Sequence, residues 1–406
     1  MRVTIEKGRA DGSVFAPASK SMAHRLLICA GLSEGESVIH GVSECEDVLA
    51  TIDCLRSFGV ECIRDGETVT VIGGKDFVKR APLSALCCRE SGSTLRFLLP
   101  VALLSGGDTT LCGAPGLMQR PMSVYEDICA ERGLKYEKND GCITVRGPLT
   151  AGTYNVVGNI SSQFISGLIF ALTLANGDSV ISITQPIESR SYINLTISAL
   201  KEFGVEVTWS DERTLVIKGN QKYCAHETTV EGDYSNAAFL DALNLLDGNV
   251  DVLGLKEDSI QGDKVYKSLY RMLTKGTPTI HIGDCPDLGP VLFALAAIQN
   301  GAVFSGTRRL KIKESDRSAA MAEELKKFGT SVMVHDDSVV VYPADFHAPT
   351  EPLVGHNDHR IVMALSILLT VTGGCIDGAE AVKKSFPDFF LRMSELGIKV
   401  TTEETV

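Results

Sequence analysis

The feature that most constrains this chain is a phrase that occurs six times along it. In each copy a short polar turn leads into an apolar run of helical length that ends at or near a glycine, as in SKSMAHRLLICAG from Ser19. The copies are 72, 69, 73, 52 and 71 residues apart when they are aligned on Ser21, Ser93, Ser162, Ser235, Asp287 and Asp358. Such self-similarity indicates a fold assembled from copies of one supersecondary unit.

A second phrase follows in most copies and consists of an amphipathic helix, a glycine and a β-rich segment. SALKEFGVEVTW from Ser198 and RMSELGIKV from Arg392 are examples. The glycine suits a left-handed helix C-cap, and β-branched residues resume after it. The fourth copy, KSLYRMLTKGTPTIHI, matches least well. Each unit is therefore predicted to run strand, apolar helix, strand, amphipathic helix and paired strands.

The first helix of each unit is apolar around nearly its whole circumference, which predicts burial on all sides. Six such helices exceed one small core, so we expect two domains with three buried helices each, for which 406 residues suffice. Each of these helices begins with Ser, Asp, Asn or Gln, which cap backbone amides. Taken singly they are only caps. If three parallel helices per domain point their N-termini at a common cleft, the combined partial positive charges predict an anion-binding site.

Basic side chains gather near the same helix starts. Arg25, Arg96 and Arg360 lie inside apolar runs, where an unpaired guanidinium is costly. A buried ion pair or a bound anion would satisfy each of them, and for Arg96 both interpretations stay open. Recurrence favours an anion for Arg25 and Arg360, because Arg offers a planar bidentate fork. The remaining basic residues of this set are Lys20, Arg120, Lys313, Arg317 and Lys384.

Carboxylates accompany the basic residues in the second half of the chain. Glu314 and Asp316 lie between Lys313 and Arg317, and Asp287 opens the fifth apolar helix. A carboxylate in a cationic site usually has a lowered pKa, which suits a base or an ion-pair partner. Charge neutralisation alone is the alternative for each.

Composition excludes several classes of protein. A net charge of −12, from 39 Lys and Arg against 51 Asp and Glu, argues against a nucleic-acid binder and against an anionic membrane surface. The longest apolar runs are too short to span a bilayer and the N-terminus lacks a signal-peptide pattern, so we expect a soluble cytoplasmic protein.

The spacing of the 12 cysteines gives a disulfide or metal interpretation little support, and we expect small buried thiols. His356 and His359 form an HxxH pair, but further metal ligands are not apparent nearby.

Segments along the whole chain resemble, in order, the 5-enolpyruvylshikimate-3-phosphate synthase family of 3-phosphoshikimate 1-carboxyvinyltransferases. They are PASKSMAHR, ESGSTLRFLLP, MQRPM, SSQF, ESRSYI, VEGDYSNAAF, QGD, CPDLGP, KIKESDR, NDHR and KSFPDFF. The resemblance implies an α/β (α+β) fold with two domains, each of three βαβαββ repeats around buried parallel helices, an inside-out α/β barrel. It implies a first domain over residues 17–232 and a second over 1–16 plus 233–406, with a first strand at about Met1 to Ala16 and the active site in the cleft between the domains.

The resemblance also implies an activity. The family transfers the enolpyruvyl group of phosphoenolpyruvate to the 5-hydroxyl of shikimate 3-phosphate by addition and elimination, with release of phosphate, in the shikimate pathway of aromatic amino-acid biosynthesis. Its pattern assigns shikimate 3-phosphate to Lys20, Ser21, Arg25, Ser161, Ser162, Gln163, Ser189, Asp287 and Lys313. It assigns phosphoenolpyruvate to Lys20, Gly92, Arg120, Gln163, Arg317, Arg360 and Lys384.

By the same analogy Asp287 is the base at the hydroxyl, while Glu314 and Lys20 handle the proton at the methyl carbon. The resemblance implies no metal and no cofactor. We expect the two small-molecule substrates as the partners of a cytoplasmic monomer, without nucleic acid or membrane.

Two departures and two alternatives accompany this assignment. Glu90 stands where Asn is frequent, and Arg309 where some members place an Asn that touches the shikimate phosphate. One alternative is the related transferase that uses UDP-N-acetylglucosamine, which typically carries a Cys a few residues before the position of Arg120, where this chain has Pro115. The other is a non-catalytic anion-binding scaffold, which retention of the residues assigned to catalysis disfavours.

Overall fold

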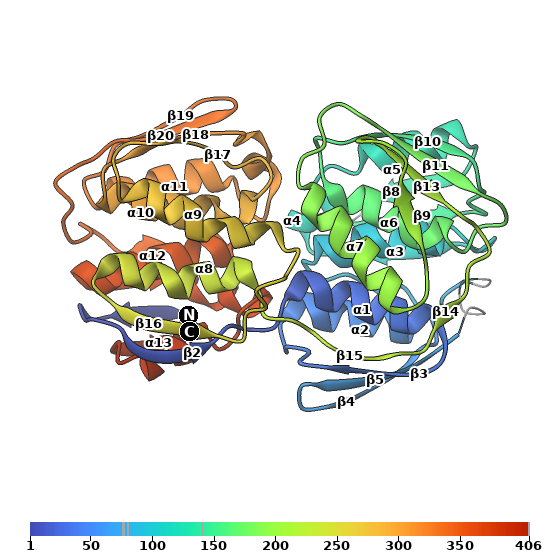
Figure 1. The fold of residues 1–406 in the computed structure, drawn as a ribbon, viewed down its shortest axis with the longest axis horizontal. Helices are drawn as coiled ribbons and strands as arrows, with labels where there is room; N and C mark the ends of the chain where they lie inside the picture. The colour runs from blue at the N-terminus through green and yellow to red at the C-terminus, as the bar shows by residue number, and fades with distance from the viewer. Residues whose placement is uncertain (75–77, 79–80, 140, 405–406) are drawn as a thin grey trace. The chain divides into compact units, whose positions relative to one another are not determined.

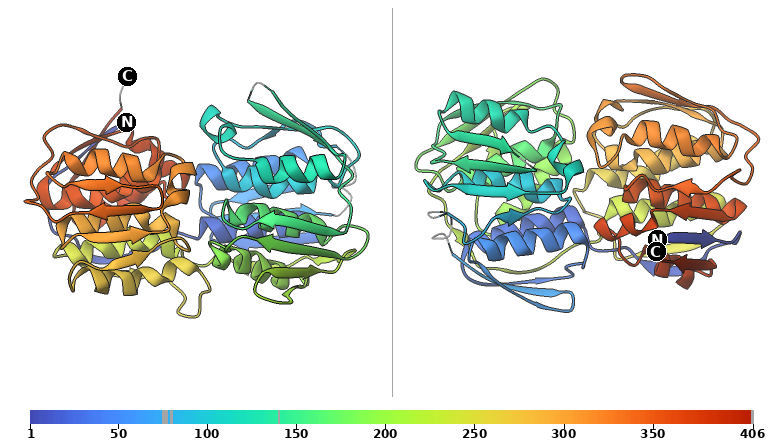
Figure 2. Two further views of the ribbon diagram at one scale, coloured as in Figure 1. Left: turned by 90° about the horizontal axis from the view of Figure 1, so that it is seen from above. Right: turned by 180° about the vertical axis from the view of Figure 1, so that it is seen from behind.

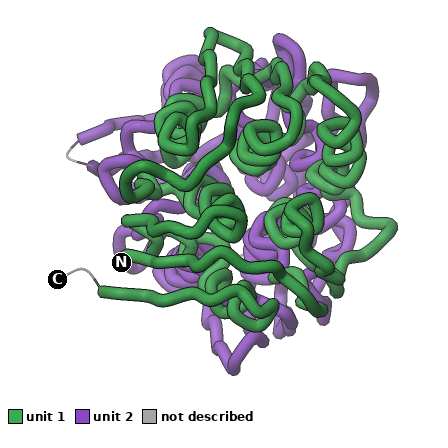
Figure 3. Tube along the Cα trace, turned by 90° about the vertical axis from the view of Figure 1, so that its left-hand side faces the viewer, with its two compact units in different colours: residues 1–17, 232–406 green, residues 18–231 purple. Residues whose placement is uncertain are grey.

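The computed structural model describes residues 1–74, 78, 81–139 and 141–404. The chain forms two compact units (Figure 3): unit 1 is Met1–Pro17 with Gly232–Val406, and unit 2 is Ala18–Glu231. The expected first domain began at Pro17 and ended at Gly232, and both residues belong to unit 1. Backbone hydrogen bonds explain the shift, because Asp233 N donates to Pro17 O at 2.8 Å. The chain therefore crosses between the units directly after Pro17 and directly before Gly232.

Unit 2 repeats one sheet pattern three times. In the sheets β6-β7-β9-β8 and β10-β11-β13-β12 two parallel strands come before and after a buried helix, and two antiparallel strands follow. The sheet β14-β3-β5-β4 has the same order, but the strands parallel to β3 are β14 and β15 from the end of the unit. The strands are β3 (Ser33–His40), β4 (Glu61–Asp65), β5 (Thr68–Gly73), β6 (Leu86–Cys87), β7 (Thr109–Cys112), β8 (Lys135–Asn139), β9 (Cys142–Arg146), β10 (Thr153–Val157), β11 (Ser179–Thr184), β12 (Val207–Trp209), β13 (Thr214–Ile217), β14 (Tyr223–Cys224) and β15 (Glu227–Thr229). The helices are α1 (Lys20–Leu32), α2 (Glu46–Ser57), α3 (Gly92–Ala102), α4 (Pro115–Met118), α5 (Ser123–Glu131), α6 (Ser162–Leu172) and α7 (Arg190–Glu202).

Helices α1, α3 and α6 are the apolar helices of the repeat, and they lie inside the strands of their unit (Figure 1). In α1 every residue from Met22 to Leu32 is buried, as the sequence predicts. A serine caps each of the three helices, because its side chain accepts a hydrogen bond from a backbone amide in the first turn. These serines are Ser19, Ser91 and Ser161. The amphipathic α7 buries one face only, as its alternation of apolar and polar residues requires.

Unit 1 follows the same plan, with strands outside and apolar helices inside (Figure 2). Its sheets have the orders β21-β22-β1-β23, β17-β18-β20-β19 and β16-β2. The strands are β1 (Arg2–Ile5), β2 (Asp11–Phe15), β16 (Asn249–Leu253), β17 (Thr279–His281), β18 (Ala302–Ser305), β19 (Val332–Val334), β20 (Ser338–Val341), β21 (Leu353–Val354), β22 (Gly374–Asp377) and β23 (Val400–Glu403). The α-helices are α8 (Tyr234–Ala242), α9 (Tyr266–Leu273), α10 (Gly289–Ile298), α11 (Arg317–Lys326), α12 (His359–Thr372) and α13 (Phe389–Glu395). Short 3₁₀ helices occupy Leu243–Leu246, Gly262–Val265, Pro286–Leu288, Arg308–Ile312 and Ala379–Lys384.

The N-terminal segment forms two strands where one was expected. The first, β1, pairs antiparallel with both β22 and β23, whereas β2 pairs parallel with β16 in a different sheet. The chain leaves the first sheet at Glu6, whose amide donates to Lys399 O, and reaches the second at Asp11. Within the described residues β16 pairs with β2 alone, and the segment after α9 continues as β17 in the next sheet, so the fourth copy lacks paired strands of its own after its amphipathic helix.

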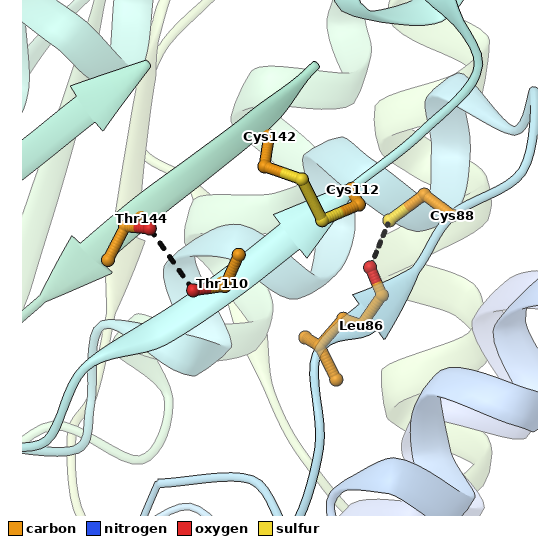
Figure 4. Close-up of a disulfide and its surroundings, with 6 residues drawn as sticks. All are labelled: Leu86, Cys88, Thr110, Cys112, Cys142 and Thr144. Atoms are coloured by element: carbon orange, nitrogen blue, oxygen red, sulfur yellow. Dashed lines mark hydrogen bonds between the residues drawn. A yellow bond between two sulfur atoms is a disulfide. The ribbon is translucent and has the colours of Figure 1, made fainter. Parts of the chain in front are cut away.

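One pair of cysteines corrects the expectation of reduced, buried thiols. Cys112 and Cys142 form a disulfide with their Cα atoms 4.2 Å apart (Figure 4). They are partners in the antiparallel register of β7 and β9, so strand pairing brings together two residues separated by 30 positions. The sequence spacing carries no trace of this register. Of the ten free cysteines, seven are buried as expected.

None of the helices in the described residues combines the length and apolarity needed to cross a bilayer.

Candidate functional site

Each unit gathers predicted site residues at the N-terminal ends of its buried helices. We call them the unit 2 cluster (around the starts of α1, α3 and α6) and the unit 1 cluster (around the starts of α8, α10, α11 and α12).

In the unit 2 cluster, side chains connect the starts of α3 and α6. Arg96 Nη1 donates to Gln163 Oε1 at 2.7 Å, and Gln163 Nε2 donates to Ser93 Oγ at 3.0 Å. Gly92, the first residue of α3, leaves room beside them. A methyl group on Gly92 would lie 3.1 Å from Arg120 Nη1 and 3.5 Å from both Arg96 Nη1 and Gln163 Oε1. The predicted residues Gly92, Arg120 and Gln163 are therefore neighbours, and Arg96 orients Gln163.

Arg25 of α1 is a buried cation whose hydrogen-bond partners are neutral. Its side chain is 2% exposed and donates to Ser21 O, Thr196 Oγ1 and Tyr192 O at 2.5, 2.8 and 2.9 Å. Its guanidinium also lies 5.0 Å from the centre of the Phe97 ring. Burial lowers the pKa of Arg25 to about 10, because no carboxylate of the described chain forms an ion pair with it. An anionic ligand would supply the missing charge.

The other predicted residues of this unit lie at helix starts. Lys20 begins α1, and its Nζ lies 2.8 Å from Asp47 Oδ2 on α2. Sequence reasoning missed Asp47, because nothing in the local sequence signals a contact across 27 residues. Ser161 caps α6 and Ser162 is its first residue, while Ser189 precedes α7 with a left-handed φ of 59°. All three serines are buried.

The unit 1 cluster is centred on Asp287. Its carboxylate lies 2.8 Å from Arg317 Nη1, 3.3 Å from Lys313 Nζ and 3.5 Å from Arg360 Nη2. Burial alone would raise the pKa of Asp287, but the charges of these three residues outweigh burial and hold that pKa well below 3.8. Burial also lowers the pKa of Lys313, against the opposing charge of Asp287. Asp287 is therefore an ionised carboxylate across the neutral pH range.

Arg317, at the start of α11, connects three carboxylates. It is 1% exposed, and its nitrogen atoms donate to Asp287, Glu314 and Asp358 at 2.8, 2.8 and 2.9 Å. Its predicted contact with phosphoenolpyruvate stays a prediction, since the structure places the guanidinium among acids. The sequence predicted Asp358 as a cap at the start of the sixth apolar helix, which the structure confirms, but not its ion pair with Arg317.

Arg360 and Lys384 complete this cluster. Arg360 Nη1 donates to Ser235 O and Asn236 Oδ1, and its Nη2 donates to Ser235 Oγ at 2.6 Å. Lys384, at the end of the 3₁₀ helix Ala379–Lys384, donates to Asn357 O at 2.6 Å. Arg360, near the start of α12, thus contacts the start of α8, and Lys384 contacts the residue before the cap of α12.

A candidate group of metal ligands lies beside α11. Side-chain ligand atoms of Glu323, Glu324 and His356 lie within 4.8 Å of one another. Lys327 Nζ lies 3.0 Å from Glu324 Oε2, and His356 Nε2 lies 3.0 Å from Glu324 Oε1. We assign these contacts to a buried ion-pair network that ties α11 to the start of α12, and we assign no metal there.

Comparisons with known proteins are consistent with this arrangement. A family model described as EPSP synthase (3-phosphoshikimate 1-carboxyvinyltransferase) matches residues 5–393. A 3-phosphoshikimate 1-carboxyvinyltransferase of Clostridium kluyveri is 39% identical over 425 residues, covering 97% of each chain. One from Clostridium botulinum (strain Alaska E43) is 38% identical, covering 97% of this chain and 96% of the relative.

Two solved structures share the fold. The structure of EPSP synthase from Acinetobacter baumannii superposes with a TM-score of 0.80 at 24% identity, over 99% of this chain and all of that chain. The enolpyruvyl transferase NikO from Streptomyces tendae superposes with a TM-score of 0.76 at 15% identity, over 98% of each chain. These confirm the expected two-domain enolpyruvyl transferase-like fold class.

Proposed function

This chain belongs to the EPSP synthase family, and from that premise we propose that its two clusters act together on one pair of substrates. The enzyme is a 3-phosphoshikimate 1-carboxyvinyltransferase of the shikimate pathway, which leads to the aromatic amino acids. It moves the enolpyruvyl group of phosphoenolpyruvate to the 5-hydroxyl of shikimate 3-phosphate and releases phosphate. The relatives carry the name of this activity, so we assign shikimate 3-phosphate rather than UDP-N-acetylglucosamine as the acceptor.

The observation that carries the proposal is the buried guanidinium of Arg25. It is 2% exposed, and its three hydrogen-bond partners are neutral oxygen atoms. Neutral oxygen atoms stabilise a buried guanidinium less than an anion does, so a dianionic phosphate is the more favourable partner for Arg25. We assign the shikimate 3-phosphate contacts of this unit to Arg25 together with Lys20, Ser21, Ser161, Ser162, Gln163 and Ser189. The hydroxyls and free amides at the helix starts add donors for the same anion.

Phosphoenolpyruvate takes the position next to Gly92 in this proposal. The absent side chain of Gly92 lets a carboxylate or phosphate approach the start of α3, where Arg120 and Gln163 supply donors. Arg96 keeps Gln163 in place through its 2.7 Å hydrogen bond. From unit 1, Lys384, Arg360 and Arg317 hold the remaining charge of this substrate.

The reaction requires a base for the 5-hydroxyl, a proton donor for the methylene carbon of phosphoenolpyruvate, and cations that stabilise the phosphate and carboxylate charges. Asp287 is ionised by its cationic neighbours and is the base that accepts the proton of the 5-hydroxyl. Glu314, held by Arg317 at 2.8 Å, and Lys20 deliver the proton to the methylene carbon and remove one after the addition. The 5-hydroxyl oxygen bonds to C2 of phosphoenolpyruvate, and phosphate leaves from the same carbon. Lys313 holds Asp287 and the acceptor substrate together.

Phosphate release from phosphoenolpyruvate tests the proposal directly. We expect release with shikimate 3-phosphate as acceptor and none with UDP-N-acetylglucosamine. Absence of release with shikimate 3-phosphate would leave only the non-catalytic scaffold or the other acceptor.

Arg25→Ala tests the observation that carries the assignment. A hydrogen bond to a charged group contributes about 1.5 to 3 kcal/mol, so we expect the KM for shikimate 3-phosphate to rise roughly 10- to 100-fold. The thermal stabilisation that this substrate gives the wild-type protein should disappear. Arg213→Ala, which removes an exposed arginine of unit 2, is the matched control and should change neither value. Undiminished thermal stabilisation of the Arg25 variant would contradict the assignment.

We further propose that the enzyme works as a cytoplasmic monomer. Light scattering on the eluting protein during size-exclusion chromatography tests the oligomeric state, and a dimer mass would overturn it.

A further inference from the structure

Three cysteines lie side by side across neighbouring strands of the second sheet of unit 2. In the parallel pair β6 and β7, Cys87 is the register partner of Cys112. In the antiparallel pair β7 and β9, Cys112 is the register partner of Cys142. Register partners project their side chains to the same face of a sheet. Cys87, Cys112 and Cys142 therefore form one row, which we call the cysteine row.

The cysteine row lies on the outer face of this sheet. The row next to it, Leu86, Leu111 and Ile143, is fully buried and faces the core. Cys87 is exposed, and Cys112 and Cys142 are half-buried. A surface cavity of about 440 Å³ has Pro115 and Gly141 in its wall, next to the ends of the same strands. Because Cys87 itself is exposed, small thiols in solution have access to this end of the sheet.

The central cysteine has two partners within reach. It is bonded to Cys142 in the structure (Figure 4). Its register partner on the other neighbouring strand, Cys87, is a free thiol. Neighbouring strands are about 4.8 Å apart, and disulfides join Cα atoms at about 4.4 to 6.8 Å. Strand β6 is a two-residue strand at the edge of its sheet, and of its two residues Leu86 is buried while Cys87 is exposed.

We propose that the cysteine row is a thiol–disulfide exchange site. The Cys87 thiolate attacks Cys112 Sγ, the Cys112–Cys142 bond breaks, and Cys142 leaves as a thiolate that takes up a proton. One disulfide is lost and one is formed, so the exchange needs no external oxidant. Reduction of either disulfide consumes two equivalents of a low-molecular-weight thiol, which becomes the oxidised disulfide.

The exchange bears on substrate binding, a step that rests on the proposed function. Cys87 and Cys112 end the two strands that lead into the turn before Gly92 and into the segment that carries Arg120. Backbone bonds join the two segments there, since Cys88 N donates to Cys112 O at 2.7 Å and Ala114 N donates to Arg89 O at 2.8 Å. A disulfide between Cys87 and Cys112 would draw these strand ends together and shift Arg120 relative to Gly92.

Mapping of the disulfides tests the exchange without any assay of activity. The wild-type protein is oxidised with glutathione disulfide at about pH 8, near the usual thiol pKa, and its free thiols are then alkylated. Trypsin places the three cysteines in separate peptides, 81–89, 97–132 and 139–146. We expect alkylated Cys142 together with a crosslink between the first two peptides. A fixed Cys112–Cys142 bond, with Cys142 never alkylated, would overturn the proposal.

Two variants serve as controls for this experiment. Cys87→Ser should abolish the alkylation of Cys142, because the attacking thiol is missing. Cys224→Ser removes the other exposed thiol of the described chain and should behave as wild type. Alkylation of Cys142 that persists in Cys87→Ser would also overturn the proposal.

Cys142→Ser isolates the alternative disulfide and its effect on the site. On oxidation this variant should form Cys87–Cys112, and the crosslinked form should have a severalfold higher KM for phosphoenolpyruvate than the same variant after reduction. The KM for shikimate 3-phosphate should change less. Cys142→Ala is the second variant if serine at this position prevents folding. Failure to form the crosslink overturns the exchange, and an unchanged KM overturns its coupling to the site. Absence of phosphate release in reduced wild-type protein would instead count against the proposed function.

Discussion

Both clusters lie at the N-terminal ends of helices, but their buried arginines have different hydrogen-bond partners. In unit 2, Arg25 donates to three neutral oxygen atoms. In unit 1, Arg317 donates to three carboxylates. The positive charge of Arg25 is therefore available to an anionic ligand, whereas Arg317, Lys313 and Arg360 surround Asp287 and keep it ionised. In terms of the proposed function, we call the unit 2 cluster the anion-binding half and the unit 1 cluster, which holds the proposed base Asp287 and Glu314, the acid–base half.

The helix caps account for part of this difference, because Asp358, one of the three carboxylates that Arg317 contacts, is the cap of α12. The buried helices of unit 2 are capped by Ser19, Ser91 and Ser161, which are uncharged. In unit 1, Asp233 and Asp358 cap the buried helices α8 and α12, and Asp316 caps the amphipathic α11. The third buried helix, α10, has no side-chain cap, because Asp287, expected at its start, lies in the preceding 3₁₀ helix Pro286–Leu288. Serine and aspartate are similarly good N-caps. The choice between them leaves the helices intact and changes the net charge of the cluster.

The largest expected effect comes from the centre of the acid–base half. Asp287→Asn keeps the shape of the side chain but removes the base, and general-base catalysis contributes about 10²- to 10⁴-fold. We expect turnover to fall by that factor, while the KM for phosphoenolpyruvate changes far less. Phosphate release measures the turnover, and thermal unfolding shows whether the variant is folded. Turnover within about tenfold of wild type would remove Asp287 from the acid–base half.

The next largest effect comes from replacing a serine cap of unit 2 by aspartate, the residue that caps helices in unit 1. Ser161→Asp retains a good cap for α6 but adds a negative charge beside the proposed phosphate position. We expect the KM for shikimate 3-phosphate to rise by roughly tenfold, the effect of about 1.4 kcal/mol.

Ser161→Asn is the matched control, because it has the size of aspartate and caps equally well without the charge. Its KM should stay much closer to wild type. Equal losses in the aspartate and asparagine variants would show that shape, not charge, governs this position.

A smaller effect concerns the space beside Gly92. The methyl group of Gly92→Ala would lie 3.1 Å from Arg120 Nη1, so Arg120 has to move. We expect a severalfold higher KM for phosphoenolpyruvate and a nearly unchanged KM for shikimate 3-phosphate. Gly116→Ala lies on α4, four residues before Arg120, and its methyl group meets nothing within 4 Å. Similar kinetics for the two alanine variants would contradict the role of Gly92.

The smallest effect is a contrast in pH dependence between a histidine of each unit. Burial, with the charges of Lys20 and Arg25, lowers the pKa of His24 well below 6.5. Its contribution to stability is present above about pH 6.5 and is lost as the pH falls, because only the unfolded chain takes up the proton. The hydrogen bond to Glu324 raises the pKa of His356 above 6.5. Its contribution is present below about pH 6.5 and is lost as the pH rises through the raised pKa.

Urea unfolding between pH 5 and pH 8.5 measures both slopes. His24→Asn should flatten the acid side of the stability profile, and His356→Gln should flatten the alkaline side with a loss of about 1 kcal/mol, the usual net value of one hydrogen bond. If both variants flatten the same side of the stability profile, the two histidines do not have opposite pKa shifts and this contrast between the units is wrong.

Periodic features of the chain were predictable and pairings across the fold were not. The apolar helices, their caps and the basic residues beside them repeat along the sequence, so their type and order follow from local physics. The Lys20–Asp47 ion pair and the Cys112–Cys142 disulfide depend on which elements pack together, and no spacing signals that. The environment of Arg317 likewise needed the structure, because its partner Asp358 is 41 residues away.

The pairing of β1 has a consequence for synthesis of the protein. This strand is synthesised before every other described strand, yet its partners β22 and β23 are the last two described strands. At about 5 to 20 residues per second, the strand waits roughly 20 to 75 seconds for them. Unit 2, in contrast, is complete once Glu231 has emerged. The chain therefore completes unit 2 first, and β1 lacks both of its strand partners until β22 and β23 have been synthesised.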